Sequence, residues 1–158
     1  MINIQYPFRP RSTSYMLPGQ FWTIPLNGGK FACGRVIEIE PNSRRGFLAG
    51  LVDWIGEHPP TEDDLKHRKT IRQFDVHTKT IHETALDGCI TGYRPLELDG
   101  IESDYFISQM FHSENCMLQK GYKILRQATK QEAEKYDVLG TSGYLVIKIY
   151  AEKLLKHA

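Results

Sequence analysis

The sequence has few of the features that mark several large classes of protein. It contains three cysteines, Cys33, Cys89 and Cys116, and no two of them form a C-x-x-C pair. An odd number of cysteines without metal-binding spacing is typical of free thiols in a reducing cytoplasm. No apolar stretch is long enough for a signal peptide or a membrane span. We therefore expect a cytoplasmic protein without a membrane partner.

The charge balance also lacks an excess of one sign. Twenty lysines and arginines face nineteen aspartates and glutamates, which gives a net charge of +1. Proteins that bind nucleic acid through its phosphates usually carry a strongly basic surface. The basic group at 66–72 has no interleaved aromatic residue, and it is typical of a solvated helix end. The balance therefore predicts no nucleic-acid partner.

Catalytic and cofactor-binding motifs are missing as well. The sequence has no G-x-S-x-G elbow, no phosphate-binding P-loop and no H-E-x-x-H zinc pattern. His77 and His82 lie five residues apart, without carboxylates arranged around them as further ligands. We expect a protein that is not an enzyme and that holds neither a metal nor a cofactor.

What the sequence does have is the composition of a folded chain. It is 158 residues long, with 41% hydrophobic and 11% aromatic residues. This is enough to bury a sizeable core, and the length fits one domain. We predict a single domain over residues 1–158. Residues 1–17, broken by Pro7 and Pro10, are expected to form an extended lead-in, in which residues 2–6 could pair with a sheet edge.

Residues 18–40 have the pattern of a β-hairpin. Aromatic and β-branched residues fill 21–26, an Asn-Gly-Gly sequence interrupts the run, and a second β-rich run follows. The glycines can adopt the positive φ that a tight two-residue turn needs. Pro25 has no amide donor, so we expect the first strand to lie at an edge or to be bulged there. Gly34 indicates a bend or a close backbone approach.

Strands and short helices alternate along the rest of the chain. Thr129 and Glu132 have the spacing of a capping box, which predicts a helix to about Val138. Residues 143–156 have the spacing of a terminal helix, although Val-Ile-Lys-Ile-Tyr also suits a strand. The other predicted elements are a buried strand at 47–55, a short helix from 61–64, a strand around 71–77, a helix or turn at 81–88, a strand at 89–98, an apolar element at 105–111 and a strand at 116–127. The expected fold is α+β: a strongly twisted antiparallel β-sheet, open to SH3-like or barrel-like closure, with two or three short helices mainly in the C-terminal half.

Two motifs in the first part of the chain resemble a known family. The run G-x-F-W-x-I-P-L followed by N-G-G-K-F-A-x-G-R-V, at residues 19–36, resembles the opening motif of the immunity protein 26 family. The run I-T-G-Y-R-P-L at 90–96 is a second, weaker likeness. Members of that family accompany bacterial polymorphic toxins and protect the producing cell. The resemblance therefore implies a non-catalytic immunity protein that binds and neutralises a cognate protein toxin.

Two alternative functions stay open beside this one. PemK-like endoribonucleases, on SH3-like barrels, also begin with a glycine, a hydrophobic strand and a glycine turn. They carry Arg-Pro and an aliphatic strand directly after that turn, whereas here Arg94-Pro95 comes much later. A nucleic-acid-binding module on a small β-barrel is disfavoured by the near-zero net charge.

Two stretches combine acidic residues with an aromatic residue, a mixture that protein interfaces use. Charged loops beside such a centre speed association and add specificity. We expect the second stretch to contribute more, because its acids are the densest negative charge in the chain and sit on a predicted loop. The first stretch, residues 54–64, supplies Trp54, Glu57, His58, Asp63 and Asp64, and the second, residues 97–105, supplies Glu97, Asp99, Glu102, Asp104 and Tyr105.

Overall fold

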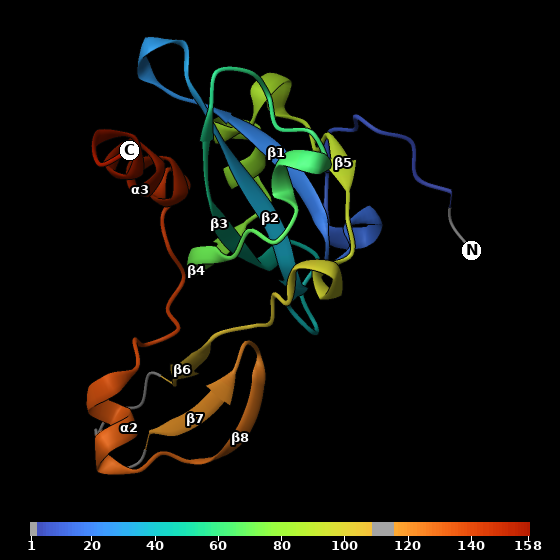
Figure 1. Cartoon of the computed structure of the whole chain (residues 1–158). Helices are drawn as coiled ribbons and strands as arrows, with labels where there is room; N and C mark the ends of the chain where they lie inside the picture. Colours follow the sequence, from blue (N-terminus) through green and yellow to red (C-terminus); the bar gives the residue numbers. More distant parts are fainter. Residues whose placement is uncertain (1–2, 109–115) are drawn as a thin grey trace.

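The computed structural model describes residues 3–108 and 116–158, and it contains two antiparallel sheets (Figure 1). The larger sheet has the order β4-β3-β2-β1-β5, and the smaller has the order β6-β7-β8. Neither sheet closes into a barrel within these residues, and the predicted α+β class is confirmed. The strands are β1 (Gln20–Pro25), β2 (Phe31–Ile39), β3 (Gly46–Gly56), β4 (Thr70–His77), β5 (Gly92–Tyr93), β6 (Tyr105–Ile107), β7 (Met117–Lys120) and β8 (Lys123–Gln127). The α-helices are α1 (Lys79–Thr84), α2 (Lys130–Lys135) and α3 (Val146–Lys156).

β1 and β2 form the predicted hairpin, but their connection is longer than two residues. The amide of Leu26 donates to the carbonyl oxygen of Lys30 at 2.8 Å, and Gly28 and Gly29 between them both have positive φ. The predicted need for glycine is therefore correct, and the predicted turn length is wrong. Pro25 lies at an edge as expected, because β5 pairs with β1 only at its other end.

Gly34 provides the close approach that its place in a strand predicted. A Cβ atom at Gly34 would lie 2.3 Å from Cζ2 of Trp22, which is its partner across the hairpin. The indole ring therefore occupies the space where any larger side chain would be. Trp22 is fully buried, and its ring meets the ring of Phe47 edge-on with 6.0 Å between centroids.

The main core lies on one face of the larger sheet, where α1 and α3 pack. β3 lies between β2 and β4 and is buried from residue 47 to 52, as its near-continuous apolar run predicted. α3 contributes Ile147 and Ala151, both fully buried in this core. Their spacing of four places both side chains on one face of a helix. Of the two conformations that suit 143–156, the helix is the one that forms.

Glycine and proline account for two elements that differ from their predictions. Residues 116–127 form two strands instead of one, because Gly121, with φ of +56°, turns the chain between β7 and β8. The predicted strand at 89–98 is reduced to β5, because Pro95 stops the pairing and a 3-10 helix, η5 (Leu96–Asp99), follows.

Further differences concern the lengths of short elements. The predicted helix after Thr61 is a single 3-10 turn, η3 (Asp63–Leu65). The capping box at Thr129 and Glu132 is confirmed, with both reciprocal hydrogen bonds present, but α2 ends at Lys135. Of the apolar element predicted at 105–111, residues 105–107 form β6, and residues 109–111 lie outside the described residues. In the lead-in, Phe8 pairs with Ile90 in an isolated antiparallel β-bridge.

The two sheets meet through a small apolar cluster and several polar contacts. In Figure 1 the smaller sheet and α2 lie below the larger sheet, and the chain crosses between them just before β6. The hydroxyl of Tyr122 donates to the Asp75 carboxylate at 2.6 Å, and Ser103 Oγ donates to the Glu38 carboxylate at 2.7 Å. The apolar cluster consists of Ile37, Leu48, Leu96, Ile101 and Phe106, with Tyr122 and Leu139 packed against it. None of the described helices is both long and apolar enough to cross a membrane.

Candidate functional site

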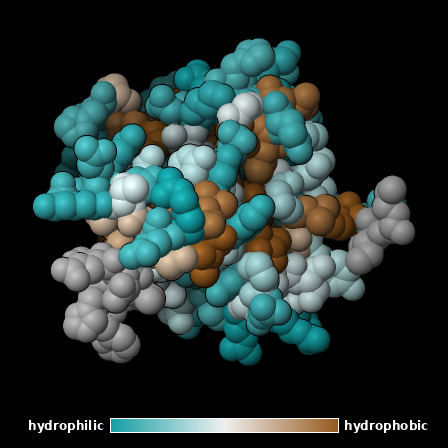
Figure 2. All heavy atoms as spheres, turned by 90° about the horizontal axis from the view of Figure 1, so that it is seen from below, coloured by the Kyte–Doolittle hydropathy of each residue, from teal (hydrophilic) through white to brown (hydrophobic). Residues whose placement is uncertain are grey.

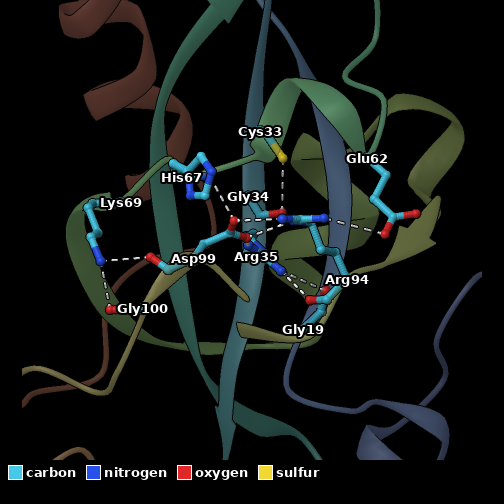
Figure 3. Close-up of polar contacts among 10 residues, drawn as sticks. All are labelled: Gly19, Cys33, Gly34, Arg35, Glu62, His67, Lys69, Arg94, Asp99 and Gly100. Carbon is cyan, nitrogen blue, oxygen red and sulfur yellow. Dashed lines mark hydrogen bonds and ion pairs between the residues drawn. The ribbon is translucent and has the colours of Figure 1, made fainter. Parts of the chain in front are cut away.

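The two predicted partner-binding stretches meet at a residue that belongs to neither. Arg94, directly after β5, places Nη1 3.6 Å from Oε1 of Glu62 in the first stretch. Its Nε lies 2.9 Å from Oδ2 of Asp99 in the second stretch. The structure therefore brings the two stretches side by side, with an arginine between them (Figure 3).

Asp99 is the centre of a buried ion cluster, which we call the Arg35–Asp99–Arg94 cluster. Its carboxylate accepts a hydrogen bond from Nη1 of Arg35 at 2.8 Å. It also accepts bonds from Nε and Nη2 of Arg94, at 2.9 and 3.0 Å, and from the amide of His67 at 2.8 Å. β2 presents Arg35 and η5 presents Asp99, so the cluster fastens the chain after β5 to the middle of the larger sheet.

The cluster is buried, and its hydrogen bonds keep Asp99 charged there. The side chains of Arg35 and Asp99 are both 0% exposed. Burial alone would raise the pKa of Asp99, but the hydrogen bonds from Arg94, Arg35 and the His67 amide outweigh it and hold the pKa at about 2. Arg35 Nη2 also donates to the carbonyl oxygens of Gly19 and Arg94, whereas its Nε has no partner among the described residues.

The expectation that Asp99 displays its carboxylate on an exposed loop is therefore wrong. Asp99 is 3% exposed and all of its carboxylate contacts are internal. Its backbone is held too, because Lys69 Nζ donates to the carbonyl oxygens of Asp99 and Gly100 at 2.7 and 2.9 Å. One acid of the loop predicted to bind a partner thus neutralises arginines inside the fold.

Trp54 is also a core residue instead of an exposed aromatic centre. It is 8% exposed and packs in a cluster with Phe21 and Leu65 on the face of the larger sheet opposite the main core. The ring of His58 lies 6.1 Å from its ring at the surface. The expectation that Trp54 anchors a partner is corrected by this burial.

The acids of the first stretch divide into paired and open groups. Glu57 pairs with Lys30 at 2.5 Å, and this hydrogen bond lowers the pKa of Glu57. The Asp64 carboxylate accepts a hydrogen bond from the amide of Thr61 at 2.8 Å, and this bond lowers the pKa of Asp64. Asp63 is exposed. The charged side chains of the first stretch therefore lie around Trp54, whose own side chain is buried.

Most of the second stretch stays on the surface, and part of it lines a groove. Glu97, Glu102, Asp104 and Tyr105 are exposed, unlike Asp99. The groove has a volume of about 690 Å³ and lies between the start of β4 and the crossing to β6. Its lining is Lys69, Thr70, Ile71, Arg72, Gln73, Gly100, Ile101, Glu102, Ser103, Asp104, Tyr105, Phe106, Lys120, Lys135, Tyr136 and Asp137.

The groove also contains residues that the sequence gave no reason to connect with the acidic loop. Arg72 Nη2 lies 3.5 Å from Asp137 Oδ2. The rings of Tyr105 and Tyr136 lie 5.7 Å apart, tilted by 37°. These residues come from β4, from β6 and from the segment after α2, and only the tertiary fold brings them together.

Side chains of the larger sheet fix the loop that forms one wall of the groove. Gln73 Nε2 donates to the carbonyl oxygen of Glu102 at 2.9 Å, and Gln73 Oε1 accepts from the amide of Asp104 at 2.8 Å. Ser103, between them, donates to Glu38. A binding loop held in this way loses little conformational freedom when a partner binds.

The surface at this end of the molecule mixes apolar and charged groups. Figure 2, viewed from below, shows brown apolar side chains among hydrophilic ones on the side of the smaller sheet. Exposed apolar residues of this region include Ile124 and Leu125 of β8, and Val138 beyond α2. Such a mixture suits a protein partner better than a nucleic acid.

Catalysis by a metal ion or by a reactive thiol requires particular groups among the described residues. No group of three or more His, Cys, Asp and Glu side chains in the described part of the chain could hold a metal ion. Cys33 is fully buried, and loss of hydration raises the pKa of its thiol strongly, which keeps the thiol protonated. What the arrangement provides is a fixed loop, a groove and charged rims.

Comparison with known proteins gives one match. The family model described as Immunity protein 26 matches residues 17–117. No match is found among curated proteins or among solved structures. The matched range includes β1 to β6 and all three members of the Arg35–Asp99–Arg94 cluster, and α2 and α3 follow it.

Proposed function

We propose that this chain, which belongs to the immunity protein 26 family, binds and neutralises a cognate protein toxin without catalysing a reaction. The observation that carries the proposal is the family match over residues 17–117. In this proposal the protein acts in the bacterial cytoplasm, as part of a polymorphic toxin system, and protects the cell that makes the toxin.

The structure supports this function through the way it uses the two motifs that resemble the family. Arg35 lies in the first motif and Arg94 in the second, and both bind the same buried carboxylate of Asp99. That cluster holds the start of the acidic loop against the larger sheet, while Glu102 and Asp104 further along remain on the surface. The motifs thus build a rigid platform beside the surface that we assign to the toxin.

The interface in this proposal is the exposed part of the two predicted stretches. Glu97, Glu102, Asp104 and Tyr105 supply one side, and Glu57, His58, Asp63 and Asp64 supply the rim of the other. Exposed acids of this kind raise the rate of association with a basic partner more than they raise affinity.

A binding experiment with charge-reversed variants tests the proposal. The partner is the protein encoded immediately upstream of this gene, where a toxin gene is expected. The double variant Glu97→Lys, Glu102→Lys should fold normally, associate with the toxin several-fold more slowly in low salt, and show a weaker dependence of the rate on salt. Glu83→Lys on α1, an exposed acid outside both stretches, is the matched control.

Two results would contradict this assignment. If the wild-type protein neither binds the upstream-encoded protein nor rescues cells that express it, the proposed function is wrong. If it binds and the double variant associates at the wild-type rate, the function stands and these two acids are not part of the interface.

The absence of catalysis is tested separately. Purified protein is incubated with RNA and with DNA, with and without divalent metal ions, and both nucleic acids should remain intact. Cleavage that is lost in an Arg35→Lys or His58→Ala variant would favour a nuclease over an immunity protein.

A further inference from the structure

The charges that line the groove are largely paired with one another. Lys120 Nζ lies 3.1 Å from Glu102 Oε1, and Arg72 pairs with Asp137. Lys69 donates to two backbone carbonyl oxygens of the loop. Lys135 lies over the ring of Tyr136, with Nζ 5.1 Å from the ring centre. Most of the groove's charge is therefore already satisfied within the protein.

Asp104 is the exception, because its backbone is held while its carboxylate is not. Its amide donates to Gln73 at 2.8 Å, and its carbonyl oxygen accepts from the amide of Gly121 at 2.9 Å. No hydrogen bond or ion pair to its carboxylate occurs within residues 3–108 and 116–158. The loop thus fixes the backbone of Asp104 at the groove, and the described residues give its carboxylate no partner.

The surroundings of Asp104 make that state unfavourable for the isolated protein. Asp104 is exposed, but the protein around its carboxylate removes enough water to raise its pKa, and none of the groove's cations forms an ion pair with it in the described part of the chain. A carboxylate that is partly desolvated and unpaired destabilises a fold, and it is retained most often where a ligand supplies the missing charge.

Two tyrosine rings that line the same groove as Asp104 offer a second feature that favours a cation. Tyr105 follows Asp104 directly, and its ring lies 5.7 Å from that of Tyr136. Lys120 Nζ already lies 5.6 Å from the centre of the Tyr105 ring. Tyrosine faces attract cations, and a guanidinium group can stack on such a ring while it forms two hydrogen bonds to a carboxylate.

We infer that the groove receives an arginine side chain of the toxin, which pairs with Asp104 and stacks beside Tyr105 and Tyr136. This inference rests on the proposed function, and it adds the chemistry of the partner. The charge of the arginine is complementary to the one carboxylate of the groove that the described residues leave unpaired. An acidic toxin segment fits less well, because the rim cations already have partners or lie over a ring.

The decisive variant is Asp104→Asn, which keeps the shape of the side chain and removes its charge. It should weaken binding of the upstream-encoded toxin about tenfold or more, since truncating one partner of a desolvated charge pair has a large effect. Its melting temperature should stay at the wild-type value or rise, because an unfavourable charge is removed. Glu83→Gln on α1, an exposed acid outside the groove and outside both stretches, should bind like the wild type.

A small probe separates this inference from the proposed function. We would titrate acetyl-Gly-Arg-Gly-amide into the protein and follow the tyrosine resonances by NMR, with the isosteric citrulline tripeptide as the control. The arginine peptide should shift resonances of Tyr105 and Tyr136 in the wild-type protein and not in Asp104→Asn. The citrulline peptide should shift neither.

Each outcome then has one reading. If the toxin binds Asp104→Asn as tightly as the wild type, the inference is wrong and the function stands. If the toxin does not bind but the arginine peptide does, the function is wrong and the site stands. If neither binds, both are wrong. A fall of several degrees in the melting temperature of Asp104→Asn, or a dimer of this chain that closes over the groove, would also overturn the inference.

Discussion

Replacing Asp99 with asparagine measures how far the fold depends on the Arg35–Asp99–Arg94 cluster. Asparagine keeps the shape of the side chain but removes the charge that Arg35 and Arg94 share. Because Arg35 is 0% exposed, its guanidinium would keep its charge inside the protein without a counterion. Removing one partner of a buried ion pair destabilises a protein by about 3–5 kcal/mol. That is a large part of a typical stability of about 5–15 kcal/mol.

The pKa of Asp99 gives a second measure of the same interaction. A shift from the ordinary value of 3.8 to about 2 corresponds to about 2–3 kcal/mol of stability. Since the pKa is lower in the folded state than in the unfolded state, this stabilisation is complete above about pH 4. It is lost as the pH falls through 4 toward 2. The wild-type protein should therefore lose stability across this window, and Asp99→Asn should lose about 2–3 kcal/mol less.

Urea unfolding followed by tryptophan fluorescence measures both effects, because Trp22 and Trp54 are buried. Curves at pH 7 give the difference in the free energy of unfolding, and curves between pH 5 and pH 2 give its pH dependence. Glu97→Gln, an exposed acid in the same 3-10 helix, is the matched control and should change stability by less than about 0.5 kcal/mol. Two results together would refute the reasoning: a free energy of unfolding of Asp99→Asn within about 1 kcal/mol of the wild type, which is close to the error of such curves, and an unchanged pH slope.

Three further substitutions test the core and the joint between the sheets. Trp22→Ala should lower the free energy of unfolding by about 3–5 kcal/mol because Trp22 is fully buried; an unchanged melting temperature with lost protection would instead make Trp22 a toxin contact. Ile147→Ala should cost about 2–5 kcal/mol in urea unfolding, whereas Leu145→Ala, at a half-exposed residue, should change little, and equal effects would mean that α3 does not close the core. Tyr122→Phe removes a hydrogen bond to Asp75 and should cost about 0.5–1.5 kcal/mol by thermal unfolding; an unchanged melting temperature would show that this bond does not help to join the sheets.

The features that the sequence predicted well depend on neighbours in the chain. The hairpin follows from alternating apolar residues and an Asn-Gly-Gly turn, and the α2 capping box follows from a spacing of three residues. Glycine within a strand indicates a bend or a close approach, and Gly34 makes a close approach. The sequence did not reveal that Trp22 fills the space.

The features that it missed depend on partners far away in the chain. In the sequence, Asp99 resembles its exposed neighbours Glu97 and Glu102. It is a core residue because it binds Arg35, which lies 64 residues earlier in the chain. Trp54 likewise ends a strand beside acids, and its burial depends on Leu65 folding over it. Local patterns predict where strands and helices form, but they do not show which charged groups the fold will bring together inside.

The position of α3 has a consequence for how the protein folds while it is being made. β1 to β4 leave the ribosome with one face of their sheet lacking Ile147 and Ala151, which belong to the helix synthesised last among the described elements. At about 5–20 residues per second, the chain from His77 to Val146 takes roughly 3–14 s to synthesise. During that interval the apolar face of the sheet is exposed to other chains. Under the proposed function, protection begins only after this delay, and a cell that makes both proteins benefits when synthesis of this chain starts before the toxin is active.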